Sequence, residues 1–264
     1  MTDSAALHAT SGVPSGSPGP RSAPNAVGGA DGVGPRGKRP RSRPEWLAPA
    51  GLILLSLVPI VAGAFRLTEL TSGATITAEN ARFFDSPVPV ITHIIGSSTF
   101  LLLGALQFVP SLRRRRWHRI AGRIVAPAGV LSGLSALWMT LFYEIPPPNG
   151  TALVVLRLGF GTAMVVSIVL AFVAILRGDV RTHSAWMTRA YAIGLGAGTQ
   201  VLTFLVWTVF FGTPDDTMYA VPMGAGWVIN LAVAEVIIRR RVQRPSRGST
   251  RVPRPGTAPR AHLS

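Results

Sequence analysis

The basic residues of this chain fall into four clusters that alternate with long apolar stretches. The clusters occupy residues 21–43, 113–123, 177–189 and 239–260, and of the 26 Lys and Arg residues only Arg66, Arg82 and Arg157 lie elsewhere. Lys and Arg gather in the cytoplasmic loops of multi-span membrane proteins, whereas the opposite loops hold few of them. The pattern therefore predicts a membrane protein with both termini in the cytoplasm.

Between the clusters, six segments are long and apolar enough to cross a bilayer as helices, which takes roughly 20 residues each. They are residues 46–65, 88–112, 124–143, 153–176, 190–211 and 221–238. An even number of spans agrees with two cytoplasmic tails. The sequence thus predicts an all-α bundle of six transmembrane helices over residues 46–238, flanked by basic tails at residues 1–45 and 239–264. Both tails are rich in Pro, Ser, Gly or Arg and are expected to be disordered.

Composition limits the chemistry. The net charge is +15, but basic residues beside membrane spans are explained by topology and anionic lipid headgroups, so we do not expect nucleic-acid binding. The chain has no cysteine, which excludes disulfides, thiolate metal ligands, iron–sulfur clusters and covalently attached haem. The sequence shows no nucleophile–base set and no phosphate-binding glycine loop, and it leaves open whether the protein is an enzyme.

Two histidines, His118 and His183, lie at the starts of the third and fifth predicted spans, at matched depth on the cytoplasmic side. Such a pair could ligate the iron of a b-type haem, with propionates bound by Arg119, Arg123 and Arg189 and electrons exchanged with a quinone. One alternative is that both histidines are interfacial anchors. Another is a zinc site that adds Asp179 as a third ligand.

A second group of polar residues lies within the predicted spans. His93 and Arg157 fall near the outer ends of the second and fourth spans, and Gln107 lies near the inner end of the second. Ionisable groups at membrane depth are costly and point to function, so the three residues are predicted to line a path for a small solute. Alternatively, Arg157 pairs with acidic residues of the outer loops. We expect Glu235 to pair with Arg239, four residues later.

Small residues recur at helix-packing spacing in two predicted spans, as Gly129 with Gly133 and as Gly194 with Gly198. This spacing favours close helix contacts inside one bundle, with a dimer interface as the alternative. The connection of residues 66–87 is long for a loop between spans, and its Phe83, Phe84 and Asp85 permit a short interfacial helix.

Four motifs resemble those of a family of uncharacterised bacterial predicted membrane proteins. They are HIIG at 93–96, LGALQF at 103–108, HRIAGR at 118–123 and RGDVRTHSAWMTRAYA at 177–192. The resemblance covers about residues 88–211 and implies a bacterial inner-membrane location without an established activity. Members of that family often have an Arg where this chain has Thr199 and Gln200. The chain is more loosely similar to six-helix bis-histidine b-type cytochromes, which implies at most one haem, on His118 and His183.

Three functional hypotheses follow. The first is a single-haem electron-transfer protein acting at the inner leaflet through His118 and His183. The second is a carrier or channel for a small solute that uses His93, Arg157 and Gln107. The third is a non-catalytic membrane scaffold or sensor whose basic tails recruit partners.

Overall fold

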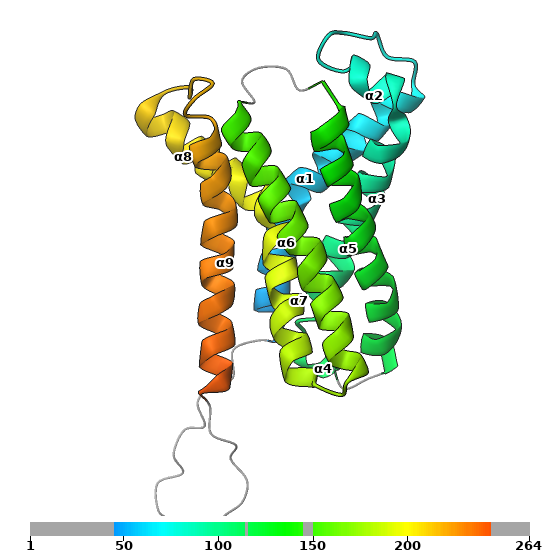
Figure 1. The fold of residues 1–264 in the computed structure, drawn as a ribbon, viewed down its shortest axis with the longest axis vertical. Helices are drawn as coiled ribbons and strands as arrows, with labels where there is room; N and C mark the ends of the chain where they lie inside the picture. The colour runs from blue at the N-terminus through cyan, green and yellow to red at the C-terminus, as the bar shows by residue number, and fades with distance from the viewer. Residues whose placement is uncertain (1–44, 114–115, 145–149, 244–264) are drawn as a thin grey trace, which may run out of the picture. The chain divides into compact units, whose positions relative to one another are not determined.

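The computed structural model describes residues 45–113, 116–144 and 150–243, and all regular structure within these ranges is helical. The predicted tails lie outside these ranges except for residues 45 and 239–243, and the predicted start of the second tail at residue 239 is wrong, because α9 continues to Val242. The helices are α1 (Leu47–Thr71), α2 (Ala81–Asp85), α3 (Pro87–Leu106), α4 (Pro110–Arg113), α5 (Arg116–Phe142), α6 (Thr151–Leu176), α7 (Val180–Gly194), α8 (Gly196–Phe211) and α9 (Ala220–Val242). Figure 1 shows α2 at the top of the bundle and α4 at the bottom.

The predicted number of spans agrees with this structure. Helices α1, α3, α5, α6 and α9 are each long and apolar enough to cross a membrane, and α7 with α8 forms a sixth span if the bent pair counts as one. Many large apolar side chains on the helix surfaces are exposed, among them Leu54, Phe65 and Phe210. A soluble protein rarely exposes so much apolar surface, whereas lipid would cover it.

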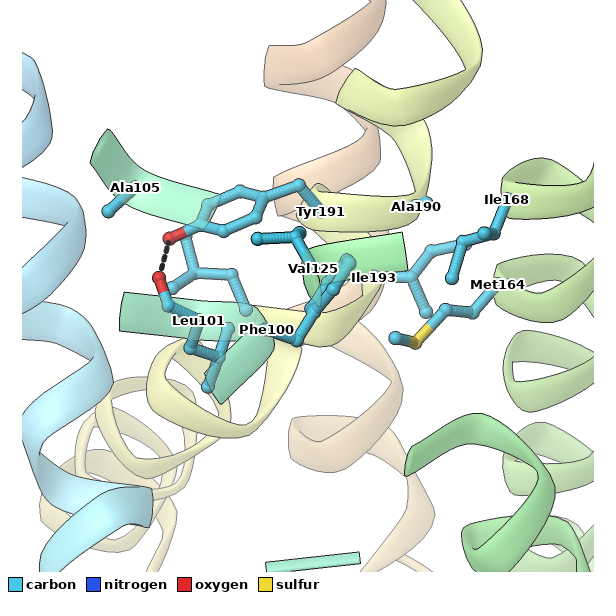
Figure 2. Packing of buried hydrophobic residues seen from close by; sticks show 10 residues of the cluster. Phe100, Leu101, Ala105, Val125, Met164, Ile168, Ala190, Tyr191 and Ile193 are labelled. Atoms are coloured by element: carbon cyan, nitrogen blue, oxygen red, sulfur yellow. Dashed lines mark hydrogen bonds between the residues drawn. The ribbon is translucent and has the colours of Figure 1, made fainter. Parts of the chain in front are cut away.

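Helix α3 packs mainly on α5. Helix α6 packs on both α5 and α7, and α8 packs on α9. Helix α1 contacts α3 and α8. The core lies where α3, α5, α6 and α7 meet and includes Phe100, Val125, Met164 and Ile193. Figure 2 shows this cluster, in which the Tyr191 hydroxyl donates to the Leu101 carbonyl at 2.9 Å. This hydrogen bond satisfies a hydroxyl that is buried among apolar side chains.

The turn between α6 and α7 follows directly from the local sequence. Gly178 has a positive φ of 76°, and the Asp179 amide donates to the Ala174 carbonyl at 2.9 Å, which is a glycine-terminated helix end. The Asp179 carboxylate then accepts from the Thr182 amide at 2.9 Å and caps α7. As a result α7 begins at Val180, ten residues before the predicted span at 190–211.

The fifth span is bent, which the sequence analysis did not predict. Helices α7 and α8 meet at Leu195 with a bend of 45°. A Cβ on Gly196 would collide with the Trp227 ring, and one on Gly198 would collide with the Leu55 carbonyl. Glycines here let α9 and α1 approach the break closely.

Side chains from α8 and α9 bind backbone groups around the bend. Asn230 donates to the Ala192 carbonyl at 3.1 Å and accepts from the Thr199 hydroxyl at 2.9 Å. A break in a membrane helix is tolerated where neighbouring polar groups satisfy the freed backbone, and Asn230 supplies such a group.

The other glycine pair packs inside the bundle. A Cβ on Gly129 would meet Phe100 and Ile168, and one on Gly133 would meet Val165. The prediction of close packing within one chain is therefore confirmed for this pair, because both glycines contact neighbours of the same bundle.

Candidate ligand cavity

A cavity of about 500 Å³ lies between the helices at the end that carries α2. Its walls come from α1, α2, α3, α5, α6, from the α7–α8 bend and from α9. The polar lining residues are Arg66, Arg82, His93, Ser97, Ser132, Thr140, Tyr143, Arg157 and Gln200, and most of the others are apolar. A volume of this size is typical of small-molecule sites.

His93 is held on one wall by the close approach of α3 and α5. One turn along α3, a Cβ on Gly96 would come within 2.9 Å of the Ala128 carbonyl, so only glycine allows this spacing. His93 Nδ1 then lies 2.9 Å from the Ser132 carbonyl oxygen. Because a carbonyl only accepts, Nδ1 carries a proton, and when the ring is neutral Nε2 can accept a hydrogen bond or a proton.

Two arginines lie over one aromatic ring at the edge of the cavity. The guanidinium carbon of Arg66 lies 4.4 Å from the Phe83 ring centroid, and that of Arg82 lies 4.5 Å from it. Arg66 also forms an ion pair with Glu69, one turn along α1. Burial, followed by the like charge of Arg66, lowers the pKa of Arg82 from its ordinary value. The attraction of each guanidinium to the face of the Phe83 ring thus offsets part of the repulsion between the two cations.

Tyr143 fixes α2 over the end of α5. Its hydroxyl donates to the Ser86 carbonyl at 2.6 Å, and its ring packs edge-on against Phe83 with centroids 5.5 Å apart. In the preceding loop, the Asn80 carboxamide oxygen accepts from the Thr77 amide at 2.7 Å. The predicted short helix in the 66–87 connection is therefore present, as α2, and it is braced against α5.

Arg157 lies in the second turn of α6 and lines the same cavity as His93. Its guanidinium is within electrostatic range of Arg82 and of Tyr219. We call Arg66, Arg82, Phe83, Tyr143 and Arg157 the rim, since all five lie near the helix ends. The three arginines of the rim are the three that fall outside the basic clusters of the sequence.

The deep part of the cavity is apolar. Its floor is formed by Phe100, Met164, Ile193 and Trp227, of which the first three belong to the buried core. Trp227 stacks on Phe160 with centroids 4.8 Å apart. Gln200 lines the cavity beside the α7–α8 bend, and its side-chain amide donates to the Met223 carbonyl at 3.0 Å. A molecule in this cavity would meet cations at one end and rings at the other.

Gln107 does not belong to this site. It ends α3, where its backbone amide donates to the Gly104 carbonyl at 3.0 Å, and it is not among the residues that line the cavity. A role of Gln107 in a solute path stays a prediction, whereas Arg66, Arg82 and Tyr143 line the cavity together with His93 and Arg157. Sequence reasoning missed these three because the first two lie 16 residues apart on separate helices and Tyr143 lies on a third.

At the opposite end, His183 Nδ1 lies 2.9 Å from the Ala171 carbonyl of α6, to which it donates. His118 is half-buried near the start of α5, and Arg119 and Arg123 are exposed. Neither histidine lines the cavity described above. Haem ligation by His118 and His183 remains a prediction.

The described residues contain no group of three or more His, Cys, Asp or Glu side chains that could hold a metal ion, and Asp179 is used as the cap of α7.

Arg189, which was predicted to bind a haem propionate, is bound by a carboxylate. Its Nη2 donates to Glu235 Oε2 at 3.1 Å, and its Nε donates to the other carboxylate oxygen. The guanidinium also lies 4.6 Å from the Trp186 ring. The expected ion pair of Glu235 with Arg239 is therefore wrong in its partner, because α9 packs on α7 and brings Glu235 to Arg189.

Comparison with known families supports the membrane assignment. The model of the family described as "Predicted membrane protein (DUF2306)" matches residues 90–238, a range that holds the four motifs noted in the sequence. No curated protein and no solved structure matches the chain.

Proposed function

The chain belongs to this family of predicted membrane proteins, and from that premise we propose that it carries a small solute, which it binds in the cavity. The observation that supports the proposal most is the cavity itself, where His93 on α3 and Arg157 on α6 line a space of about 500 Å³ within the membrane domain. Ionisable groups around a cavity between membrane helices are typical of substrate sites.

The bend in the fifth span supports transport over simple binding. Ile193 and Gly194 before the break, and Ala197 and Gln200 after it, all line the cavity. In many carriers the substrate lies beside a discontinuous helix whose halves move against the rest of the bundle. A change in the 45° angle between α7 and α8 would alter the cavity floor directly.

We place the carrier in the bacterial inner membrane with its basic end in the cytoplasm, on the strength of the Lys and Arg distribution. The absence of native cysteine allows a direct test with single cysteines introduced at Thr213 and at Arg240. In intact cells, a membrane-impermeant maleimide should label T213C and not R240C. The reverse pattern would overturn the orientation.

Transport is tested by reconstituting the purified protein in liposomes and measuring uptake of a panel of small weak acids, weak bases and neutral solutes. We expect at least one solute to be taken up, and Arg157→Gln to reduce that uptake at least tenfold. Arg177→Gln is the matched control, since Arg177 is an exposed residue at the other end of α6. Uptake of no solute, or equal loss in both variants, would refute the proposal.

The contact of His183 favours a second candidate function, the single-haem electron-transfer protein. Nδ1 donation to a backbone carbonyl is the usual arrangement of a metal-binding imidazole, and it leaves Nε2 for the iron. His118 would be the other ligand, and a bound haem would supply one-electron chemistry. Arg189 is engaged by Glu235, which leaves Arg119 and Arg123 for the propionates.

A reduced-minus-oxidised absorbance spectrum of the protein, purified after expression with ample haem, tests this candidate. A b-type signal lost in both His118→Ala and His183→Ala would support it. The absence of a signal, or a signal unchanged in both variants, would reject it.

A further inference from the structure

We propose that the molecule bound in the cavity is an amphiphilic anion, with a carboxylate or phosphate group at the rim and an apolar chain on the floor. This inference rests on the proposed function, and it names the chemical class of the solute.

The charge of the lining indicates the anion. Three guanidinium groups line the cavity, those of Arg66, Arg82 and Arg157, and no Asp or Glu is among the described residues that line it. Glu69 forms an ion pair with Arg66, and Glu79 acts electrostatically on Arg82, but neither carboxylate is in the described lining. The charged side chains of the described lining are therefore cationic, and an anion is the complementary ligand.

The way the arginines are held also favours an anion. Arg66 and Arg82 contact the Phe83 ring through their guanidinium groups. Each guanidinium has five N–H donors, so a contact with the face of one ring leaves donors for the oxygen atoms of a ligand. Tyr143 holds Phe83 in place and thereby fixes both forks before a ligand arrives. Such pre-organisation reduces the side-chain entropy lost on binding.

The floor indicates the apolar chain. Phe100, Met164 and Trp227 offer ring and thioether surface, which would leave a fully hydrated ion poorly solvated. A volume of about 500 Å³ corresponds to roughly 15 water molecules at the density of liquid water. Inorganic phosphate would fill a small part of it, whereas a carboxylate with a chain of about ten carbons would span rim and floor.

The same chemistry could come from a free amphiphile or from the headgroup and chain of an anionic lipid. The experiment therefore uses full-length protein in phosphatidylcholine nanodiscs and measures, by equilibrium dialysis against empty nanodiscs, the binding of decanoate, decanol and decyltrimethylammonium. We expect decanoate to bind at least tenfold more tightly than either of the others. Arg82→Gln with Arg157→Gln should abolish this preference, whereas Arg82→Lys with Arg157→Lys should keep most of it. Arg177→Gln should have no effect.

A second arm distinguishes the sources. If phosphatidylglycerol in the nanodisc displaces decanoate from wild-type protein, the anion is supplied by lipid, and if it does not, the ligand is a free amphiphile. Equal binding of decanol and decanoate would overturn the inference that the ligand is an anion, although the cavity would still bind a solute. Tighter binding of decyltrimethylammonium would overturn it as well. If none of the three binds while the liposome panel identifies another solute, the inference alone fails. If neither experiment finds a ligand, the proposed function fails with it.

Discussion

The two ends of the helix bundle are both rich in arginine, and the surroundings of the arginines differ. At the basic end, Arg119, Arg177 and Arg240 are exposed, and Arg189 is bound by Glu235. At the other end, Arg66, Arg82 and Arg157 line one cavity with His93. Arginine at the basic end is explained by membrane topology. Arginine around a cavity is not, and it is this difference that indicates a ligand site.

The comparison also shows how each end is built. At the basic end, the turn between α6 and α7 is defined by two neighbouring residues, Gly178 and Asp179, and the contact between Arg189 and Glu235 is half-exposed. The cavity end depends on contacts between residues far apart in the chain, such as Tyr143 with Ser86 and His93 with Ser132. Changes that separate helices should therefore damage the cavity more than the basic end.

The largest effect is expected for Gly96→Ala. The new methyl group would come within 2.9 Å of the Ala128 carbonyl and 3.2 Å of the Ser132 amide nitrogen, which forces α3 from α5 and moves His93 off Ser132. Overpacking of this kind costs about 1–3 kcal/mol of stability, measurable by unfolding in mixed micelles, and solute binding should be lost. Gly159→Ala is the control, because a Cβ there meets nothing within 4 Å. Equal stability of the two variants would show that α3 and α5 do not approach as described.

A smaller effect is expected for Asn230→Ala, which removes the hydrogen bonds to the Ala192 carbonyl and from the Thr199 hydroxyl. Hydrogen bonds between membrane helices contribute about 1 kcal/mol each. The bend of 45° between α7 and α8 should become more variable. Distances between nitroxide labels at positions 181 and 209 would report this as a broader distribution. A distribution as narrow as that of the labelled parent protein would mean that Asn230 does not hold the bend.

At the basic end, the predicted effects are modest. Arg189→Gln removes the ion pair with Glu235, which is half-exposed and should contribute less than about 1 kcal/mol. Arg239→Gln should change stability even less, because Arg239 is exposed and is not the ion-pair partner of Glu235. Thermal unfolding of the two variants side by side distinguishes them. A greater loss of thermal stability in Arg239→Gln than in Arg189→Gln would support the ion pair of Glu235 with Arg239 that was expected from the sequence.

The smallest effect concerns the cap of α7. Hydrogen bonds from the Thr182 side chain and amide lower the pKa of Asp179. A carboxylate with a lowered pKa stabilises the fold above its unfolded value, and that contribution disappears as the pH falls through the folded value. Hydrogen-exchange protection of the Thr182 amide should therefore be constant near neutral pH and fall only below the ordinary carboxyl value of about 3.9. In Asp179→Ala the protection should be low throughout, and a pH dependence that survived this change would exclude the cap.

The sequence was informative about the spans because a bilayer imposes a length and a polarity on each helix. It did not predict the bend at Leu195, since Gly194 and Gly198 fit the spacing of a straight packing motif equally well. The contacts found at the bend, of the Trp227 ring with Gly196 and of Asn230 with the Ala192 carbonyl, come from a helix some 30 residues later and have no local signal in the sequence.

The candidate site was partly accessible from sequence. His93 and Arg157 stand out as ionisable groups inside apolar spans and line one cavity, whereas Gln107, predicted with them, lies at the C-terminal end of α3 and does not line it. Arg66 and Arg82 could have been found by asking which basic residues fall outside the four clusters. Their meeting on Phe83 could not, because it depends on how the 66–87 connection folds over α5.

The central claim is that the arginines of the rim bind the solute and that those of the basic end do not. The test is native mass spectrometry of protein released from nanodiscs in the presence of decanoate. It compares wild-type protein with two variants. In the rim variant Arg66, Arg82 and Arg157 are replaced by Gln, and in the basic-end variant Arg177, Arg239 and Arg240 are replaced by Gln. We expect one bound decanoate on wild-type protein and on the basic-end variant, and none on the rim variant. Equal loading of both variants would contradict it.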